Sequence, residues 1–295
     1  MLALKINDLS KSYGNINAIK NLNLEIETGT VYGILGPNGS GKTTTLGVIL
    51  DIIRPNSGSY EWFEGNFGVN HRRKLGAILE TPNFYPYLNA LENLEIVRRI
   101  KAVPKRGFDD LLELVNLSHR KKSKFRSYSL GMKQRLAIAA TLIGEPEVLI
   151  FDEPTNGLDP QGIAEVRNIL TEIAEMGKTV IMASHLLDEV EKICSHVAIL
   201  KEGKLLATGL VGSILSDDIT IEIGSDDMDI LIEAMHKLPG VHNISRKSKW
   251  LECSIASDQK IEILNKLLFQ KGIITNHLVS RKRRLEEEFL EITKD

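Results

Sequence analysis

Cysteine is scarce in this sequence, with only Cys194 and Cys253 among 295 residues. Two cysteines cannot form a disulfide framework, and neither stands in a CxxC or Cys/His spacing typical of a metal site. His196 lies close to Cys194, but no further ligand stands beside them, so we expect no metal there. The pattern indicates a reducing cytoplasm with two ordinary thiols.

Long hydrophobic runs are absent as well. A membrane-spanning helix needs about 18 apolar residues or more, and the longest candidate here, Leu136 to Ile143, is far shorter. The first ten residues, MLALKINDLS, lack a basic region, a long apolar core and a cleavage site, so we expect no signal peptide. We therefore expect a cytoplasmic protein that serves a membrane only from its inner side and through a partner.

Charge of one sign is not in excess, since the formal net charge is −2. Domains that bind nucleic acid are usually strongly basic, so we expect no nucleic-acid partner. Two short basic runs, at 121–124 and 281–284, are typical of solvated surfaces, with lipid or nucleic-acid binding as the alternative.

The order of apolar patterns predicts an α/β fold. The first thirty residues alternate polar and apolar side chains, as half-buried antiparallel strands do. Short apolar runs typical of strands buried on both faces follow at 31–35, 147–151, 179–184 and 196–200. Helical patterns lie between them, at 43–53, 81–127 and 160–175. Strands that alternate with helices predict a parallel sheet whose functional loops stand at the C-terminal ends of its strands.

The pattern changes after about residue 215. Predicted strands at 219–223, 243–246, 250–255 and 273–278 and helices at 229–238 and 260–270 follow the order β-α-β-β-α-β. This order is that of a ferredoxin-like domain, and a charged helix, 283–293, ends the chain. We predict a domain over 1–215, with a helical subdomain at about 81–140, and a small α+β accessory domain over 216–295.

A phosphate-binding loop follows the first buried strand. The pattern GxxxxGK[ST] is met by Gly36, Pro37, Asn38, Gly39, Ser40, Gly41, Lys42 and Thr43. Glycines let backbone N–H groups cup phosphate oxygens at the start of a helix. Lys42 would neutralise the β- and γ-phosphates of ATP, and the Thr43 hydroxyl would bind Mg²⁺. Thr44, the next residue, is a further candidate for ATP contact.

A carboxylate pair ends the second buried strand. Mg²⁺ prefers carboxylate oxygen, and Asp152 would hold it, through water. Glu153 suits a general base that polarises the attacking water. An acid-rich surface turn is the alternative for such a pair, but the phosphate loop upstream favours a nucleotide site.

The segment YSLGMKQRL, residues 128–136, resembles the signature of the ABC ATPase family. Ser129 and Gly131 match the serine and the second glycine of that signature, whereas Tyr128, Leu130 and Met132 depart from it. A serine hydroxyl and glycine N–H groups that begin a helix form a second anion site. In the family this site meets the γ-phosphate held by the other subunit. Taken alone, Ser129 could be a plain helix cap.

Other positions fit the same resemblance, which covers roughly residues 2 to 210. It implies that Tyr13 stacks on adenine and that His185 contacts the γ-phosphate, although both could be structural residues at strand ends. It also implies that Asp159, in Gly157-Leu158-Asp159, communicates across a dimer at the ATP site. The implied fold joins an antiparallel β subdomain, a RecA-like parallel-sheet core and a helical subdomain.

Glu80 departs from the family, which normally has glutamine there. The resemblance places this residue at Mg²⁺ and facing the membrane subunit. Glutamate is characteristic of the branch that resembles bacitracin- and lantibiotic-export ATPases, and the ending RRLEEEFLEIT resembles tails of that branch. The alternative is that Glu80 says nothing about the transported substrate.

The resemblance implies an ATPase subunit that works as a head-to-tail pair. Two copies would enclose two Mg·ATP, and separately encoded membrane permease subunits would hold them at the inner face of the cell membrane. An ABC ATPase that acts on ribosomes or nucleic acid is the alternative, but relatives of those kinds carry two cassettes or a long coiled coil. A kinase with a phosphate loop is disfavoured by residues 128–136, and a small GTPase by the missing NKxD motif.

Overall fold

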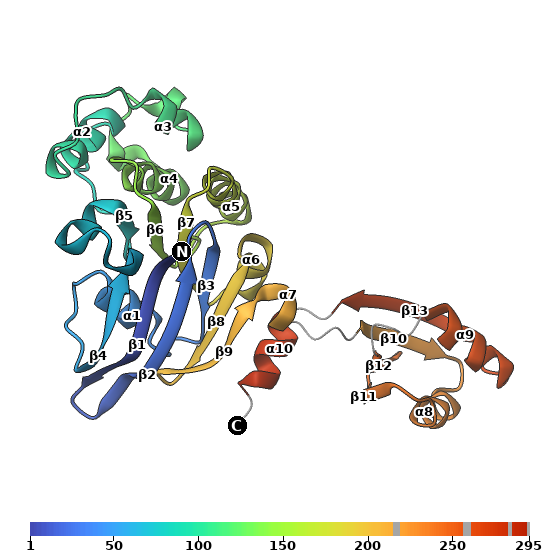
Figure 1. Cartoon of the computed structure of the whole chain (residues 1–295). Coiled ribbons are helices and arrows are strands. Elements are labelled where there is room, and N and C mark those ends of the chain that lie inside the picture. The colour runs from blue at the N-terminus through green and yellow to red at the C-terminus, as the bar shows by residue number, and fades with distance from the viewer. Residues whose placement is uncertain (215–218, 256–260, 283–284, 294–295) are drawn as a thin grey trace. The chain divides into compact units, whose positions relative to one another are not determined.

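The computed structural model describes residues 1–214, 219–255, 261–282 and 285–293 (Figure 1). The chain divides into two compact units, 1–211 and 212–295. The domain boundary predicted at 215 lies outside the described residues, as do the first residues of the helices predicted at 260–270 and 283–293. Within the part of the chain that the structure describes, no helix combines the length and apolar character needed to cross a bilayer.

Unit 1 begins with an antiparallel sheet. Strand β1 (Leu2–Tyr13) lies between β2 (Ile16–Glu27) and β4 (Ser57–Trp62). Leu4 pairs with Ile26 and Ile6 with Leu24, and these four side chains are buried. The alternation predicted for the first thirty residues is therefore confirmed, because one face of the sheet supplies core residues.

A six-stranded sheet forms the centre of unit 1. Its order is β5-β6-β7-β3-β8-β9, and all its neighbouring strands pair in parallel except β8 and β9. The bounds are β3 Val31–Leu35, β5 Leu75–Ile78, β6 Val148–Asp152, β7 Thr179–Ser184, β8 His196–Lys201 and β9 Lys204–Leu210. All residues of β3, β6 and β7 are buried, as expected for a parallel sheet covered on both faces.

Helices complete the core around this sheet. One hydrophobic cluster contains side chains of α1 (Lys42–Ile49), of β1 and β2, and of the central strands β3, β6 and β7. Helices α5 (Pro160–Glu175) and α6 (Leu187–Ile193) also pack on central strands, α5 on β7 and α6 on β3. The helix predicted at 43–53 ends early, because the chain turns at Asp51 (φ 60°) and Ile53 folds back onto Gly47.

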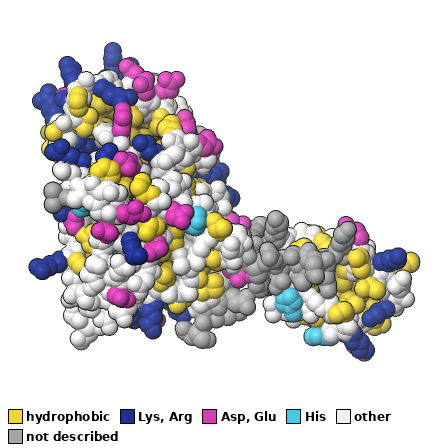
Figure 2. Space-filling model, viewed as in Figure 1, with side chains coloured by type: hydrophobic (Ala, Val, Ile, Leu, Met, Phe, Trp, Pro, Cys, Tyr) yellow, Lys and Arg dark blue, Asp and Glu magenta, His cyan; other side chains and the backbone are white. Residues whose placement is uncertain are grey.

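A group of helices stands at one end of unit 1, beyond β5 and β6 (Figure 1). It contains α2 (Ala90–Ile100), α3 (Asp109–Leu114) and α4 (Leu130–Thr141). Asn89 and Glu92 form a reciprocal capping box at the start of α2. Lys and Arg side chains lie beside hydrophobic ones over this end of the unit (Figure 2).

Unit 2 carries its own core. Its elements are β10 (Ile219–Ser225), α8 (Met228–His236), β11 (Val241–Arg246), β12 (Leu251–Ile255), α9 (Ile261–Gln270), β13 (Thr275–Lys282) and α10 (Leu285–Ile292), and α7 (Val211–Ile214) precedes them. The strands form an antiparallel sheet in the order β11-β12-β10-β13, and side chains of α8 and α9 join its core. The element order is the predicted one, and the ferredoxin-like classification stays a prediction.

Candidate functional site

Four neighbouring parallel strands bring the predicted residues to one edge of the central sheet. In the order β5-β6-β7-β3, the chain continues beyond these strands into Glu80, Glu153, His185 and Gly36. The carboxyl ends of parallel strands meet at the same edge, where ligands bind in sheets of this kind. Residues far apart in the sequence are therefore neighbours here.

The loop between β3 and α1 needs its glycines. A Cβ atom on Gly36 would lie 2.3 Å from the carbonyl oxygen of Leu200, and one on Gly41 would lie 2.2 Å from that of Ala18. Gly41 also has a φ of 104°, which side-chain-bearing residues rarely adopt. Pro37, Asn38 and Gly39 are exposed at the tip, where Ser40 N–H donates to Pro37 O over 3.1 Å. The loop thus presents backbone groups, and few side chains, to a ligand.

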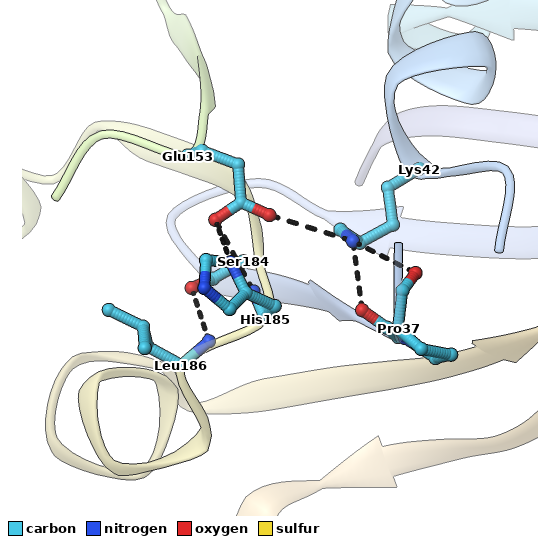
Figure 3. A network of polar contacts seen from close by, with 7 residues as sticks. Pro37, Lys42, Glu153, Ser184, His185 and Leu186 are labelled. Carbon is cyan, nitrogen blue, oxygen red and sulfur yellow. Dashed lines mark hydrogen bonds and ion pairs between the residues drawn. The ribbon is translucent and has the colours of Figure 1, made fainter. Parts of the chain in front are cut away.

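Lys42 is held inside this loop. Its side chain is only 6% exposed, and Nζ donates to Gly36 O over 2.8 Å and to Pro37 O over 3.3 Å. Nζ also lies 3.5 Å from Oε1 of Glu153 (Figure 3). Thr43 and Thr44, the next residues of α1, are exposed and half-buried respectively. The lysine charge is therefore fixed beside the loop and beside one carboxylate.

Glu153 joins Lys42 to His185. Its Oε2 lies 2.8 Å from His185 Nδ1 and accepts a 3.4 Å hydrogen bond from His185 N–H (Figure 3). The residue has a φ of 50°, and its own N–H donates to Ala183 O over 2.9 Å. The buried Ser184 does not stand out in the sequence. Its Oγ accepts a 3.0 Å hydrogen bond from Leu186 N–H, across His185.

Asp152 and its surroundings fit a divalent cation. The side chain is 4% exposed, and its Oδ1 has no hydrogen-bond partner among the described residues. Burial raises the pKa of Asp152, the charges of Glu153 and Glu80 raise it further, and a hydrogen bond from Thr43 lowers it. A buried oxygen without a partner, next to other acidic groups, is what a cation with oxygen ligands requires. Glu80, at φ 61° and exposed, follows β5 at this edge.

Ser129, Gly131 and Asp159 are brought together in a second place. Ser129 Oγ accepts from Met132 N–H over 3.3 Å at the start of α4, and Asp159 Oδ1 accepts from Gly162 N–H over 2.9 Å at the start of α5. All three residues line a pocket of about 460 Å³. Among the described residues that line it, none belongs to the phosphate loop. Two helix N-termini, each a positive dipole end, face this pocket.

Tyr13 stands at the end of β1, where the β1–β2 hairpin turns. Its ring is 48% exposed, and Lys11 Nζ lies 5.1 Å from the ring centroid while it donates to Arg54 O over 2.8 Å. A half-exposed aromatic ring of this kind is able to stack on a planar ligand.

Comparisons with known proteins agree with this geometry. A family model for ABC transporters matches residues 19–156. The chain is 46% identical to the bacitracin transport ATP-binding protein of Bacillus licheniformis, over 69% of this chain and 68% of that protein. It is 40% identical to the lantibiotic transport ATP-binding protein of Streptococcus pyogenes, over 69% and 89%.

A solved structure extends the comparison to the fold. It is a dimeric ATP-binding cassette in a post-hydrolysis state with ADP and phosphate, 28% identical, and it covers 70% of this chain and 98% of its own. The TM-score is 0.62. The antiparallel sheet, the parallel core and the helical group predicted from the resemblance are therefore confirmed, and the chain belongs to the ATP-binding, ATP-hydrolysing proteins of the ABC transporter family.

Proposed function

We propose that this chain powers the export of a peptide antibiotic or drug by binding and hydrolysing Mg·ATP between two copies of itself. The observation that carries the proposal is the contact of Lys42, at the start of α1, with Glu153 and of Glu153 with His185, the last two directly after β6 and β7. A cation for phosphate, a carboxylate base and a histidine stand together at the edge where nucleotides bind.

Each group has a chemical task. Backbone N–H groups between Asn38 and Thr44 and the Lys42 ammonium bind the phosphates. Thr43, Asp152 and Glu80 would hold Mg²⁺, which would neutralise charge on the phosphate oxygens. Glu153 accepts the proton of the attacking water at a carboxylate oxygen, and His185 orients that carboxylate through Nδ1. Tyr13 stacks on the adenine ring.

ATP and Glu153 compete for one ammonium. Glu153 Oε1 lies 3.5 Å from the same Lys42 Nζ that the phosphates require. Binding of ATP therefore replaces the Lys42–Glu153 ion pair and releases that carboxylate oxygen. Because His185 holds the other oxygen at 2.8 Å, the released carboxylate stays beside the phosphates, where a base is needed.

The second anion site requires a second copy. Ser129, Gly131 and Asp159 line their own pocket, without any phosphate-loop residue among the described lining residues. A head-to-tail pair joins the phosphate loop of one copy to the Ser129 pocket of the other, and so completes two sites by symmetry. Membrane subunits encoded separately would hold the pair at the inner, cytoplasmic face of the membrane.

Mixing two inactive variants tests this arrangement. Lys42→Ala removes the phosphate cation, and Ser129→Arg blocks the second anion site. A mixed head-to-tail dimer has one site in which both halves are intact. Equal amounts should recover about a quarter of wild-type turnover per chain, because about half of the dimers are mixed and each holds one good site of two. If the mixture stays as inactive as either variant alone, the head-to-tail arrangement is wrong.

The transported substrate is inferred from the relatives, whose names refer to transport of bacitracin and of a lantibiotic. Expression of the chain with its membrane subunits should raise the concentration of such a peptide that stops growth, and the Glu153→Gln variant should not. Unchanged growth with normal ATP hydrolysis would reject the cargo and leave the ATPase assignment in place.

A further inference from the structure

A second large pocket lies in unit 1, where four segments of the chain converge. It has a volume of about 740 Å³ and is lined by residues 72–75, 98, 100–104, 106–108 and 142–145 and by Leu111 of α3. These four segments are the residues that lead into β5, the end of α2 with the link to α3, α3 itself, and the chain after α4. A volume of this size is typical of sites for small organic ligands.

The charged side chains around this pocket are almost all basic. Six lining residues are Lys or Arg and one, Glu145, is acidic, although the whole chain has a net charge of −2. Carboxylates pair with four of the six: Arg72 with Asp51, Lys74 with Glu147, Arg98 with Glu95 and Arg106 with Glu145. Within the described parts of the chain, Arg73 and Lys101 have no carboxylate partner, so a positive excess remains.

Lys101 is the cation placed deepest. Its Nζ donates to Ile143 O over 2.8 Å and to Thr141 O over 3.1 Å, at the C-terminal end of α4. These two hydrogen bonds cap the C-terminal end of the helix and use two of the three N–H donors of the ammonium group. Burial lowers the pKa of Lys101 to about 8. An anion in the pocket would therefore satisfy the third donor and a charge that burial disfavours.

The other residues that line the pocket are mainly hydrophobic and are called its apolar floor here. They include Ile100, Val103, Pro104, Phe108, Leu142 and Ile143, and 78% of the surface of Ile100 is exposed. Yellow hydrophobic and dark blue basic side chains lie side by side over this end of the unit (Figure 2). A simple inorganic anion would contact only the basic side chains and would leave the apolar floor in contact with water.

We propose that this pocket binds a small amphipathic anion, a molecule with an apolar body and one carboxylate or phosphate group. The head group contacts Lys101 and Arg73, and the body covers the apolar floor. The pocket lies at the end of α4 opposite Ser129, and twelve helical residues separate the two, about 18 Å at the rise of an α-helix. Binding here is therefore separate from ATP binding and does not depend on the proposed transport function.

Calorimetry on the full-length protein tests the proposal with three probes below their micelle-forming concentrations. Decanoate and decyl phosphate carry the apolar body and the anion, and decanol carries the body alone. We expect both anions to bind at least about tenfold more tightly than decanol, the worth of about one charge-assisted hydrogen bond. Separate results for the two anions distinguish a carboxylate from a phosphate ligand.

Three variants locate the binding. Lys101→Met and Arg73→Gln should each weaken decanoate binding about five- to tenfold. Arg73 is an exposed side chain, so its replacement leaves the fold intact even if Lys101→Met does not. Lys105→Met is the matched control, since Lys105 is exposed on the same link but does not line the pocket.

Several results would overturn the proposal. No binding, equal binding of decanol, or wild-type affinity in both pocket variants would each exclude an anion site at this place. Saturating ATP without Mg²⁺ should leave the affinity unchanged, and competition would place the probe at the phosphate loop instead. Preferential binding of polyglutamate, which has the charge without the apolar body, would assign the pocket to an acidic protein segment.

Discussion

Replacing Glu153 by glutamine separates the two tasks of this side chain. The change removes one negative charge and keeps the size of the side chain. Glu153 Oε1 lies 3.5 Å from Lys42 Nζ, an attraction of about 5 kcal/mol at an effective dielectric constant of about 20, before desolvation is counted. Hydrogen bonds between charged groups retain about 1.5–3 kcal/mol, and the amide oxygen keeps part of that. Loss of this competition should therefore tighten ATP binding about tenfold.

The same substitution should slow hydrolysis about 10²- to 10⁴-fold, because the amide cannot take the proton of the attacking water. Phosphate release with Mg²⁺ measures the rate, and calorimetry with a chelator in place of Mg²⁺ measures ATP affinity without turnover. ATP-dependent dimerisation should survive. Glu175→Gln, at the exposed end of α5, is the control and should change neither quantity.

The two measurements fail in different ways. Normal turnover in Glu153→Gln would refute the role of this carboxylate as the base. Slow turnover with unchanged ATP affinity would keep the base and refute the competition for Lys42.

Three further perturbations test other parts of the structure. Lys42→Ala should abolish ATP binding, and unchanged affinity by calorimetry would contradict the phosphate-loop assignment. Gly41→Ala should lower the free energy of unfolding by about 3 kcal/mol or more, because the new Cβ meets a backbone oxygen at a φ of 104°. Gly39 has a φ of 81°, but a Cβ added there would have no other atom within 4 Å. Chemical denaturation of Gly39→Ala should therefore show a loss of only about 1–2 kcal/mol in the free energy of unfolding. Equal losses in Gly39→Ala and Gly41→Ala would reject the steric argument. Burial lowers the pKa of Lys101 to about 8 from 10.5, so between these values the unfolded chain binds a proton that the folded chain does not. The free energy of unfolding of the wild type relative to Lys101→Met should therefore rise across that window, by about 3 kcal/mol at most, and a flat difference in denaturation curves would show that burial is not the cause.

The sequence predicts the parts of the fold that repeat a strong pattern. The runs at 31–35, 147–151 and 179–184 are almost entirely apolar, with Glu147, Thr179 and Ser184 as the exceptions, because both faces of β3, β6 and β7 are buried. Three strands were not predicted. β5 has only four residues, β4 begins inside a turn that contains Gly58, and β9 is a half-buried edge strand with Gly209 inside. β5 is apolar but too short to show a period, whereas β4 and β9 have no run of buried residues and each contains a glycine.

Part of the candidate site can be predicted from the sequence, and part of it depends on the fold. The phosphate loop, Asp152 and Glu153 can be found from sequence because their chemistry requires fixed residue types at short spacing. The ion pair of Lys42 with Glu153 and the contact of Glu153 with His185 cannot be found, because they depend on the strand order β6-β7-β3. The basic pocket likewise exists only where four separate segments meet.

Leu130, which departs from the family signature, lies beside Gly157. A leucine in place of glycine adds a side chain at the start of α4, where close approach of a phosphate is expected. Leu130 is 45% exposed, and its Cδ2 lies 3.4 Å from the position that a Cβ would take on Gly157. Gly157 has a φ of 74°, a backbone conformation that favours glycine. The added side chain thus lies against the loop before Asp159.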